Sequence, residues 1–478
     1  MRWSPGLPKS WMTRNFPSRG KHTVAERRHI EQTLLPLLKE MTTQRPLPFE
    51  LVRSLEQVVE KHGFSSMSEN DVLTPEHESM KLYFRERDDQ AFCMVHPGKK
   101  RWDPNDGINI LVTHIDIPLL RLREQPVSFE WDPEKRFNHP GPYLELLPYA
   151  GLHAPDWEGL TGHIQGRVYV KRNTELAVKI AAKIPSTSFH LEVDGEQDVT
   201  FDRIRAFTGA ISVEGQHRQL RVGSEDDLAA AELYFVPDSR WLRLDNDFIS
   251  VYGLDDRACV GAAVHAALRS SPTRPTFVFG LTAEEIGSVG GASRTTGFFK
   301  RVINKYLTQR LHRRSLLTTE QLYDQGILGK YPALCGDVCP VMSHNEMEMP
   351  NTTPTEAARF GFGPFLTSSW GYDGNHVSGR YVKLVKNAIE SRLPSRKYQP
   401  VGSEFKSNDA YLSFISHFAR YFTDDHIPMV VVGTPVQDLH RPSGEMLYFW
   451  DWVSTIDAYQ GYLEYNPYTP RPRPAKKK

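Results

Sequence analysis

The sequence predicts a mixed α/β fold in which helices flank a central sheet and a β-rich domain is inserted. Three observations indicate this architecture. Buried strand-like runs alternate with amphipathic helical segments near both ends of the chain. From 118 to 242 the pattern changes to short strand-like pieces separated by proline and glycine. The 478 residues also exceed one core, since single cores stop growing at roughly 250–300 residues.

The spacing of apolar residues places the elements of the main domain. Leu51, Leu55 and Val58 recur at helical spacing, and Gly63 is expected to end their helix. Short apolar runs bounded by turn residues predict buried strands. The expected elements are helices over 24–41, 48–62 and 257–268 and strands over 81–84, 90–95, 108–112, 276–280 and 428–432.

The chain is expected to consist of four parts. The first 25 residues carry five basic residues and no acid, as in a transit peptide, but three prolines disfavour an amphipathic helix. The inserted part is marked by strand-like pieces at 166–170, 188–193 and 219–222. The parts are a basic flexible arm over 1–22, a main domain over 23–117 and 243–466, a β-rich insert over 118–242 and a basic tail over 467–478.

The composition excludes a general attraction to polyanions. Lysine plus arginine equal aspartate plus glutamate, at 58 each, so no net field favours nucleic acid or an anionic membrane. No apolar run approaches the roughly 20 residues that a membrane helix needs. Four cysteines are too few for a disulfide framework, which fits a reducing compartment. We therefore expect a soluble, cytoplasmic protein with no nucleic-acid and no membrane partner.

Cys335 and Cys339 flank Asp337 and allow a second interpretation. A structural zinc site would need another ligand pair at matching spacing, and none is evident. We favour the interpretation that these cysteines are small buried apolar residues.

Residue types that bind metals recur in five short motifs, in the order His, Asp, Glu, Asp, His. Nitrogen and oxygen ligands suit zinc or its neighbours, and two such ions can share one carboxylate while activating a water. The motifs are Thr113-His114-Ile115-Asp116, Leu254-Asp255-Asp256-Arg257, Ala283-Glu284-Glu285-Ile286-Gly287, Gly336-Asp337 and Leu439-His440-Arg441-Pro442.

Each motif alone has an ordinary structural explanation. Asp255 or Asp256 could cap a helix, and His440 could be a surface histidine. The set is more specific, because independent caps and surface charges have no reason to place two histidines and three carboxylates after strand-like runs. Four of the five motifs are expected at strand ends, where open α/β sheets bind their ligands.

Two neighbouring acids have chemical tasks in such a site. Asp116 can accept the ring N–H of His114 and so fix the tautomer of that ligand. Glu284 can take a proton from an activated water and pass it to a leaving amine. A metal brings the pKa of water from 15.7 toward roughly 7, and this chemistry suits amide hydrolysis.

The motifs resemble those of the aspartyl aminopeptidase family of dinuclear metallo-aminopeptidases and, more distantly, the tetrahedral aminopeptidases of the same clan. The resemblance spans about 48–462. Three motifs match: His114-Ile115-Asp116-Ile117-Pro118 with His-x-Asp-x-Pro, Leu254-Asp255-Asp256 with Leu-Asp-Asn, and Glu284-Glu285-Ile286-Gly287-Ser288 with Glu-Glu-Val-Gly-Ser. The stretches Pro148-Tyr149-Ala150-Gly151-Leu152, Gly159-Leu160-Thr161-Gly162 and Gly166-Arg167-Val168 are similar to part of the family's inserted domain.

This resemblance implies a metal-dependent aminopeptidase that removes N-terminal residues from peptides. Two divalent ions are implied; zinc is expected, and manganese and cobalt are alternatives. The implied ligands are His114, Asp255, Glu285, Asp337 and His440, with Asp255 bridging, Glu284 as general base and Asp116 as the residue that orients His114. Asp256 stands where the family has asparagine, so we give it a secondary role.

The family fold also implies an insert that forms dimers and large homo-oligomers, often dodecamers. His190 is similar to a family histidine that reaches a neighbouring subunit's active site, so it is a candidate substrate or interface residue.

Two segments depart from the family. Gly363-Pro364-Phe365-Leu366-Thr367 has Thr367 where the family has a lysine suited to an acidic substrate side chain. Threonine cannot make that charge-assisted contact, so a preference for acidic residues is not expected. The family's histidine-rich segment after the fourth ligand is also changed here, over 338–345.

Two other functions remain open at this point. The same water activation would serve a deacylase or carboxypeptidase that acts on small amides. The altered substrate segments would also fit an inactive descendant kept as an assembly scaffold, although none of the ligand types is missing.

Overall fold

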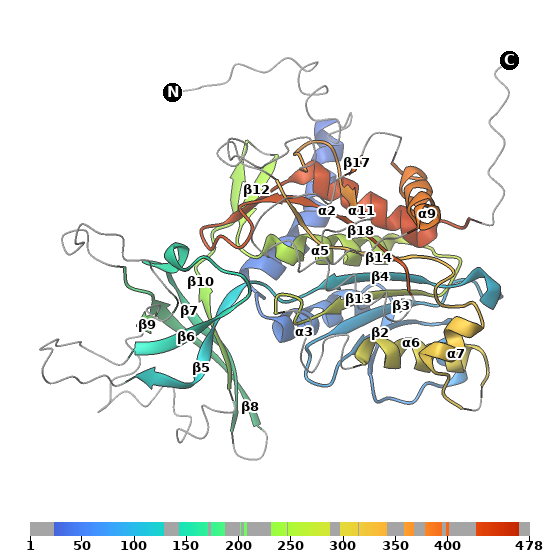
Figure 1. Cartoon of the computed structure of the whole chain (residues 1–478), viewed down its shortest axis with the longest axis horizontal. Coiled ribbons are helices and arrows are strands. Elements are labelled where there is room, and N and C mark those ends of the chain that lie inside the picture. Colours follow the sequence, from blue (N-terminus) through green and yellow to red (C-terminus); the bar gives the residue numbers. More distant parts are fainter. Residues whose placement is uncertain are drawn as a thin grey trace, which may run out of the picture.

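The structure is a computed structural model in which residues 23–128, 143–170, 174–186, 201, 205–207, 231–245, 247–286, 297–313, 315–341, 358–367, 378–393, 398–400 and 427–467 are described. The strands expected at 188–193 and 219–222, the candidate His190, the basic arm and nearly all of the basic tail lie outside these residues. Figure 1 shows an α/β region with a barrel beside it.

A mixed sheet of nine described strands forms the centre of the α/β region, in the order β1-β2-β3-β13-β4-β14-β18-β16-β17. β13, β4, β14 and β18 run parallel, and they are continuous apolar runs because both faces of the sheet are covered. This confirms the predicted mixed α/β class. The strands are Phe64–Ser68 (β1), Lys81–Arg85 (β2), Phe92–His96 (β3), Asn109–His114 (β4), Thr276–Leu281 (β13), Ala333–Cys335 (β14), Phe365–Thr367 (β16), Gln399–Pro400 (β17) and Met429–Gly433 (β18).

Helices cover both faces of this sheet (Figure 1). One face packs against α2, α3, α5, α9 and α11, and the other against α6 and α7. None of the described helices is long and apolar enough to cross a membrane. The helices are Val24–Thr43 (α2), Pro48–Glu60 (α3), Leu254–Arg269 (α5), Phe298–Arg310 (α6), Thr319–Asp324 (α7), Gly379–Glu390 (α9) and Phe449–Glu464 (α11), with short 3-10 turns at Pro75–Ser79 (η2), Pro104–Asp106 (η3) and Ala154–Trp157 (η4).

Helix α5 runs through the core between the sheet and α11. Its small residues allow this close packing: a Cβ on Gly261 would lie only 3.3 Å from Cζ2 of Trp452. The indole N–H of Trp452 donates to the carbonyl of Ala258 over 2.8 Å, which satisfies the polar atom of a fully buried ring. The start of α5, which carries Asp255, is thereby anchored in the core.

The β-rich part is a closed barrel with strand order β10-β5-β6-β9-β8-β7. All of its described strands lie within 118–242, the segment predicted as the insert. Alternate residues point inward around the buried Trp157, as expected for antiparallel strands with one buried face. The strands are Leu119–Ser128 (β5), Tyr143–Tyr149 (β6), Thr161–Val170 (β7), Thr174–Lys183 (β8), Arg205–Phe207 (β9) and Ala231–Pro237 (β10).

Buried and half-buried polar contacts join the barrel to the α/β region. Arg167 of the barrel is 1 % exposed, donates to the carbonyl of Asp88 over 2.9 Å and lies 4.6 Å from the ring of Phe49. Arg53 of α3 donates to both carboxylate oxygens of Glu175 in β8, over 2.6 and 2.9 Å. These contacts set the position of the barrel relative to the main sheet.

A second sheet, which the sequence did not predict, lies beside the first in the order β11-β12-β20-β19-β15. Its strands are too short for a clear hydrophobic period, so their pattern could not be recognised. They are Leu242–Leu244 (β11), Phe248–Val251 (β12), Cys339–Pro340 (β15), Pro435–Gln437 (β19) and Glu445–Tyr448 (β20).

Two buried histidines predict a loss of stability in acid. Burial, followed by the charge of Lys81, lowers the pKa of His96 to about 4, and burial lowers that of His265 to about 4. A histidine in the unfolded chain has a pKa near 6.5. Between pH 7 and pH 5 the unfolded chain therefore binds protons at these two histidines, whereas the native state does not. Each histidine should therefore lower the free energy of unfolding by about 2 kcal/mol when the pH falls from 7 to 5.

The measurement is the free energy of unfolding in urea at pH 7 and pH 5, for the native sequence and for His265→Gln. Glutamine can still donate to the carbonyl of Leu34, which the His265 ring contacts over 3.2 Å, and it does not titrate. The variant should lose about 2 kcal/mol less than the native chain over this range. An equal loss in both proteins would contradict the assignment.

Candidate active site

The five motifs converge at the carboxyl ends of the central parallel strands of the main sheet. β4, β13 and β14 are parallel, so their carboxyl ends meet there. His114 is the last residue of β4, and the other two strands are followed by Glu284-Glu285 and by Asp337. Asp255 and His440 follow β12 and β19 of the second sheet. Two sheets therefore supply the site.

Two groups of metal-ligand atoms share the side chain of Asp255. Nε2 of His114 lies 3.1 Å from one oxygen of Asp255 and 3.5 Å from an oxygen of Asp337. Nε2 of His440 lies 3.3 Å from the other oxygen of Asp255 and 3.6 Å from an oxygen of Glu285. Within each group the candidate ligand atoms lie within 4.8 Å of one another; the first group also includes Asp256.

The crowding of these charges shifts their pKa values. Burial alone would lower the pKa of His114, but Asp116, Asp255 and Asp337 outweigh it and raise the pKa well above its usual range. Burial would raise the pKa of Asp255, but His114 and His440 hold it far below its usual range. Burial, with like charges nearby, raises the pKa of Glu285 well above its usual range.

Several buried acceptors at the site have no hydrogen-bond donor among the described residues. They include one oxygen each of Asp256, Glu284 and Glu285. A buried acceptor without a partner costs free energy, and a bound cation would supply the missing contact. Imidazole nitrogens with carboxylate oxygens are a donor set for zinc, manganese or cobalt. The residues therefore fit divalent metal ions.

Asp116 and Gly151 lie against the rings of the two histidines. An oxygen of Asp116 lies 3.4 Å from Nδ1 of His114, within ion-pair distance although without hydrogen-bond geometry. Its other oxygen accepts from the backbone N–H of Glu285 and from the hydroxyl of Tyr149, both over 3.2 Å. Nδ1 of His440 donates to the carbonyl of Gly151 over 2.6 Å, which leaves Nε2 facing the carboxylates.

Tyr149 and Gly151 come from the barrel, so the insert contacts His440 of the second group and Asp116, the neighbour of His114. The sequence contained both residues in a motif similar to the family's insert, but nothing local indicated which atoms they contact.

Glu284 lies beside the ligand groups. It is 5 % exposed and follows Ala283, whose φ of 67° turns the chain sharply after β13. Burial raises the pKa of Glu284 to about 8; the charge of His114 opposes this, and that of Asp337 adds to it. A carboxylate whose pKa lies near neutrality is suited to accept and return a proton.

Asp256 is fully buried, and one of its oxygens accepts from the backbone N–H of His114 over 3.4 Å. The peptide bond between Asp255 and Asp256 is cis. Burial raises the pKa of Asp256 well above its usual range.

Sequence reasoning missed Glu445, the first residue of β20. This side chain is 0 % exposed and accepts from the backbone N–H groups of Leu254, Asp255 and His440. Burial, then the charge of Asp255, raises the pKa of Glu445 to about 8, whereas the N–H donors favour its ionised form. An acid five residues after His440 was the available signal, but its partners could not be identified.

The structure also gives the positions of Thr367, Cys335 and Cys339, which the sequence singled out. Thr367 ends β16 and pairs with Val431 of β18. Cys335 and Cys339 are buried with free thiols, and neither belongs to a metal-type cluster within the described part of the chain.

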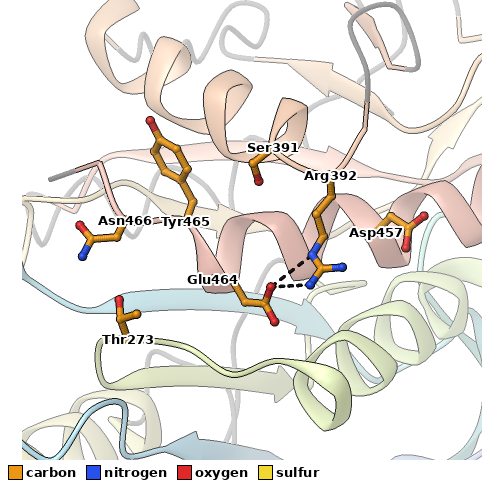
Figure 2. Close-up of a pocket in the computed structure, with 7 residues that line it drawn as sticks. All are labelled: Thr273, Ser391, Arg392, Asp457, Glu464, Tyr465 and Asn466. Carbon is orange, nitrogen blue, oxygen red and sulfur yellow. Dashed lines mark hydrogen bonds and ion pairs between the residues drawn. The ribbon is translucent and has the colours of Figure 1, made fainter. Parts of the chain in front are cut away.

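A separate surface hollow of about 660 Å³ lies near the amino-terminal end of β13 (Figure 2). Thr273, which precedes β13, lines it together with the ion pair of Arg392 and Glu464. Glu284 and Glu285 follow the other end of β13, so this hollow is separate from the candidate active site.

The ends of the strands bring together two histidines and several carboxylates, some of whose oxygens have no hydrogen-bond donor in the described part of the structure. A mixed α/β fold with such a site is typical of a metal-dependent hydrolase. The sequence model of the aminopeptidase I zinc metalloprotease (M18) family matches residues 42–327, more than half of the chain. The chain therefore belongs to this family of zinc aminopeptidases.

Sequence relatives agree with the assignment, and solved structures share the fold. A probable M18 family aminopeptidase 1 of Thermotoga neapolitana is 23 % identical over 441 residues, which cover 86 % of this chain and 91 % of the relative. The crystal structure of an M18 family aminopeptidase from Thermotoga maritima superposes with a TM-score of 0.78 at 20 % identity, covering 94 % of this chain and 98 % of that one. The mApe1 dodecamer of S. cerevisiae gives a TM-score of 0.66 at 14 % identity, covering 91 % and 97 %.

Membership supports the predicted metal-dependent aminopeptidase over the deacylase, carboxypeptidase and scaffold alternatives.

Proposed function

We propose that this chain removes N-terminal residues from peptides with two divalent ions, one in each ligand group. His114, Asp255 and Asp337 would hold one ion, and Asp255, Glu285 and His440 the other. The observation that carries the proposal is the orientation of Asp255, whose two carboxylate oxygens face different histidines at 3.1 and 3.3 Å. A carboxylate shared in this way suits a pair of ions better than one.

Other groups of the chain would transfer the proton and orient the two histidine ligands. When bound, divalent ions would lower the pKa of water and polarise a carbonyl. Glu284 takes the proton of the attacking water and passes it to the departing amine. Asp116 orients His114, and the carbonyl of Gly151 orients His440, so both ligands keep their Nε2 atoms toward the carboxylates.

The substrate should have a free N-terminal amine and no required acidic side chain. Thr367 stands where the family that the motifs resemble has a lysine, and a threonine cannot neutralise a carboxylate.

We also infer that the chain forms a homo-oligomer built from dimers. The solved mApe1 relative is a dodecamer, and this chain shares its fold over 91 % of its length. In that assembly the insert would form the dimer contact, and His190 would approach a neighbouring site.

The test is a panel of aminoacyl amides with acidic, basic and apolar side chains, each with a free or an acetylated amine. The protein is stripped by chelator and reloaded with zinc, manganese or cobalt. We expect no hydrolysis without metal, hydrolysis of free amines only, and no preference for acidic residues. Equal hydrolysis of acetylated substrates would instead identify a deacylase, and a reloaded protein without any activity would identify a scaffold.

A further inference from the structure

Glu445 connects the two ligand segments that come from the second sheet. One oxygen of this carboxylate accepts from the backbone N–H groups of Leu254 and Asp255, over 2.5 and 3.1 Å. The other oxygen accepts from the backbone N–H of His440 over 2.9 Å. Both oxygens are thus occupied by backbone donors, so Glu445 differs from Glu285, whose carboxylate is directed at the ring of His440.

The sheet register explains why this position can reach both segments. β20 lies between β12 and β19 and is antiparallel to both, so its first residue lies at the edge where those two strands end. Glu445 pairs with Val251, the last residue of β12, a few residues before Asp255. The chain leaving β19 reaches His440 at the same edge.

The two segments have backbone conformations that need such support. His440 has a φ of 62°, in the left-handed region that non-glycine residues rarely adopt. Asp255 has φ −81° and ψ 111°, which interrupts the helical conformation at the start of α5. A carboxyl side chain offers two oxygens, so it can accept from both segments at once.

We propose that Glu445 is a positioning residue that holds the bridging Asp255 and His440 together for one metal ion. The inference rests on the ligand set proposed above. Because both of its oxygens accept from backbone N–H groups, Glu445 acts through the backbone from which the two ligands project.

The test compares metal binding by the full chain and by Glu445→Gln. Glutamine keeps the size of the side chain but turns an NH2 group toward a backbone N–H, so one segment loses its acceptor. Glu86→Gln is the matched control, since Glu86 is also buried and accepts from two backbone N–H groups, those of Asp88 and Gln90, in a turn away from the site. Zinc and manganese are titrated into each stripped protein, with His440→Ala as the reference for losing one group.

We expect Glu445→Gln to bind the metal of the His440 group about 10–100-fold more weakly, as is typical when a partner of a metal ligand is removed. The kcat should recover to within a few fold at saturating metal, because the reacting groups remain. Glu86→Gln should bind both ions normally. If Glu445→Gln binds both metals as tightly as the native chain, the positioning role of Glu445 is wrong, while the proposed ligand set is unaffected.

Glu445→Asp covers the case in which the glutamine variant does not fold. It keeps the charge but is one methylene shorter, so it cannot reach both segments and should weaken the same metal. Unaltered binding in Glu445→Asp would also overturn the inference. A native chain that binds no divalent ion would refute the ligand set of the proposed function itself, and this inference with it.

Discussion

Glu284→Gln is expected to lower kcat about a thousandfold while both metal ions stay bound. The variant keeps the size of the side chain, but an amide cannot accept the proton of the attacking water. General acid–base catalysis contributes roughly 10²–10⁴-fold, so a loss in the middle of this range is expected. KM should change little, since Glu284 is not proposed to bind the substrate.

The measurement combines steady-state kinetics on a free-amine substrate with metal analysis of the same sample. Metal content serves as the internal control, because a loss of metal would lower activity for a different reason. A variant that retained both metal and near-native kcat would show that another group transfers the proton.

Asp255→Ala is expected to have the second large effect, the loss of both metal ions. Its two oxygens face His114 and His440, so removing one side chain takes a ligand from both groups. His440→Ala is the matched comparison, because it removes a ligand from one group only. Activity should fall below detection in Asp255→Ala.

Metal analysis after dialysis should give two ions in the native chain, one in His440→Ala and less than about one tenth of an ion in Asp255→Ala, because no ligand set there stays complete. A single ion retained by Asp255→Ala would mean that Asp255 serves one group rather than both. The proposed bridging role would then be wrong.

The parts of the site that were predicted are those encoded over a few residues. His114 and Glu284 follow apolar runs that were expected to be strands and are buried strands in the structure, and parallel strands bring their carboxyl ends together. The fold class followed from the same runs, because strands covered on both faces must be continuously apolar. The contact of Asp116 with His114 was predictable for the same reason, because one residue separates them.

The parts that were missed depend on contacts between distant segments. The bond from His440 to Gly151 joins residues 289 positions apart, and the bond from Asp255 to Glu445 joins residues 190 apart. The first depends on the docking of the barrel, and the second on the register of the short second sheet. Neither leaves a periodic pattern in the sequence.

The sequence by itself determined the class of fold, the inventory of metal-binding residue types and the resemblance to metallo-aminopeptidases, because apolar periodicity and short motifs are local properties of the chain. The resemblance also implied that Asp255 is a shared ligand, but only the tertiary structure decided which atoms its two oxygens face and that Glu445 and the barrel contact the ligand segments. The physical reason is that these contacts depend on strand register and on the packing of one sheet against another, which hundreds of residues determine together.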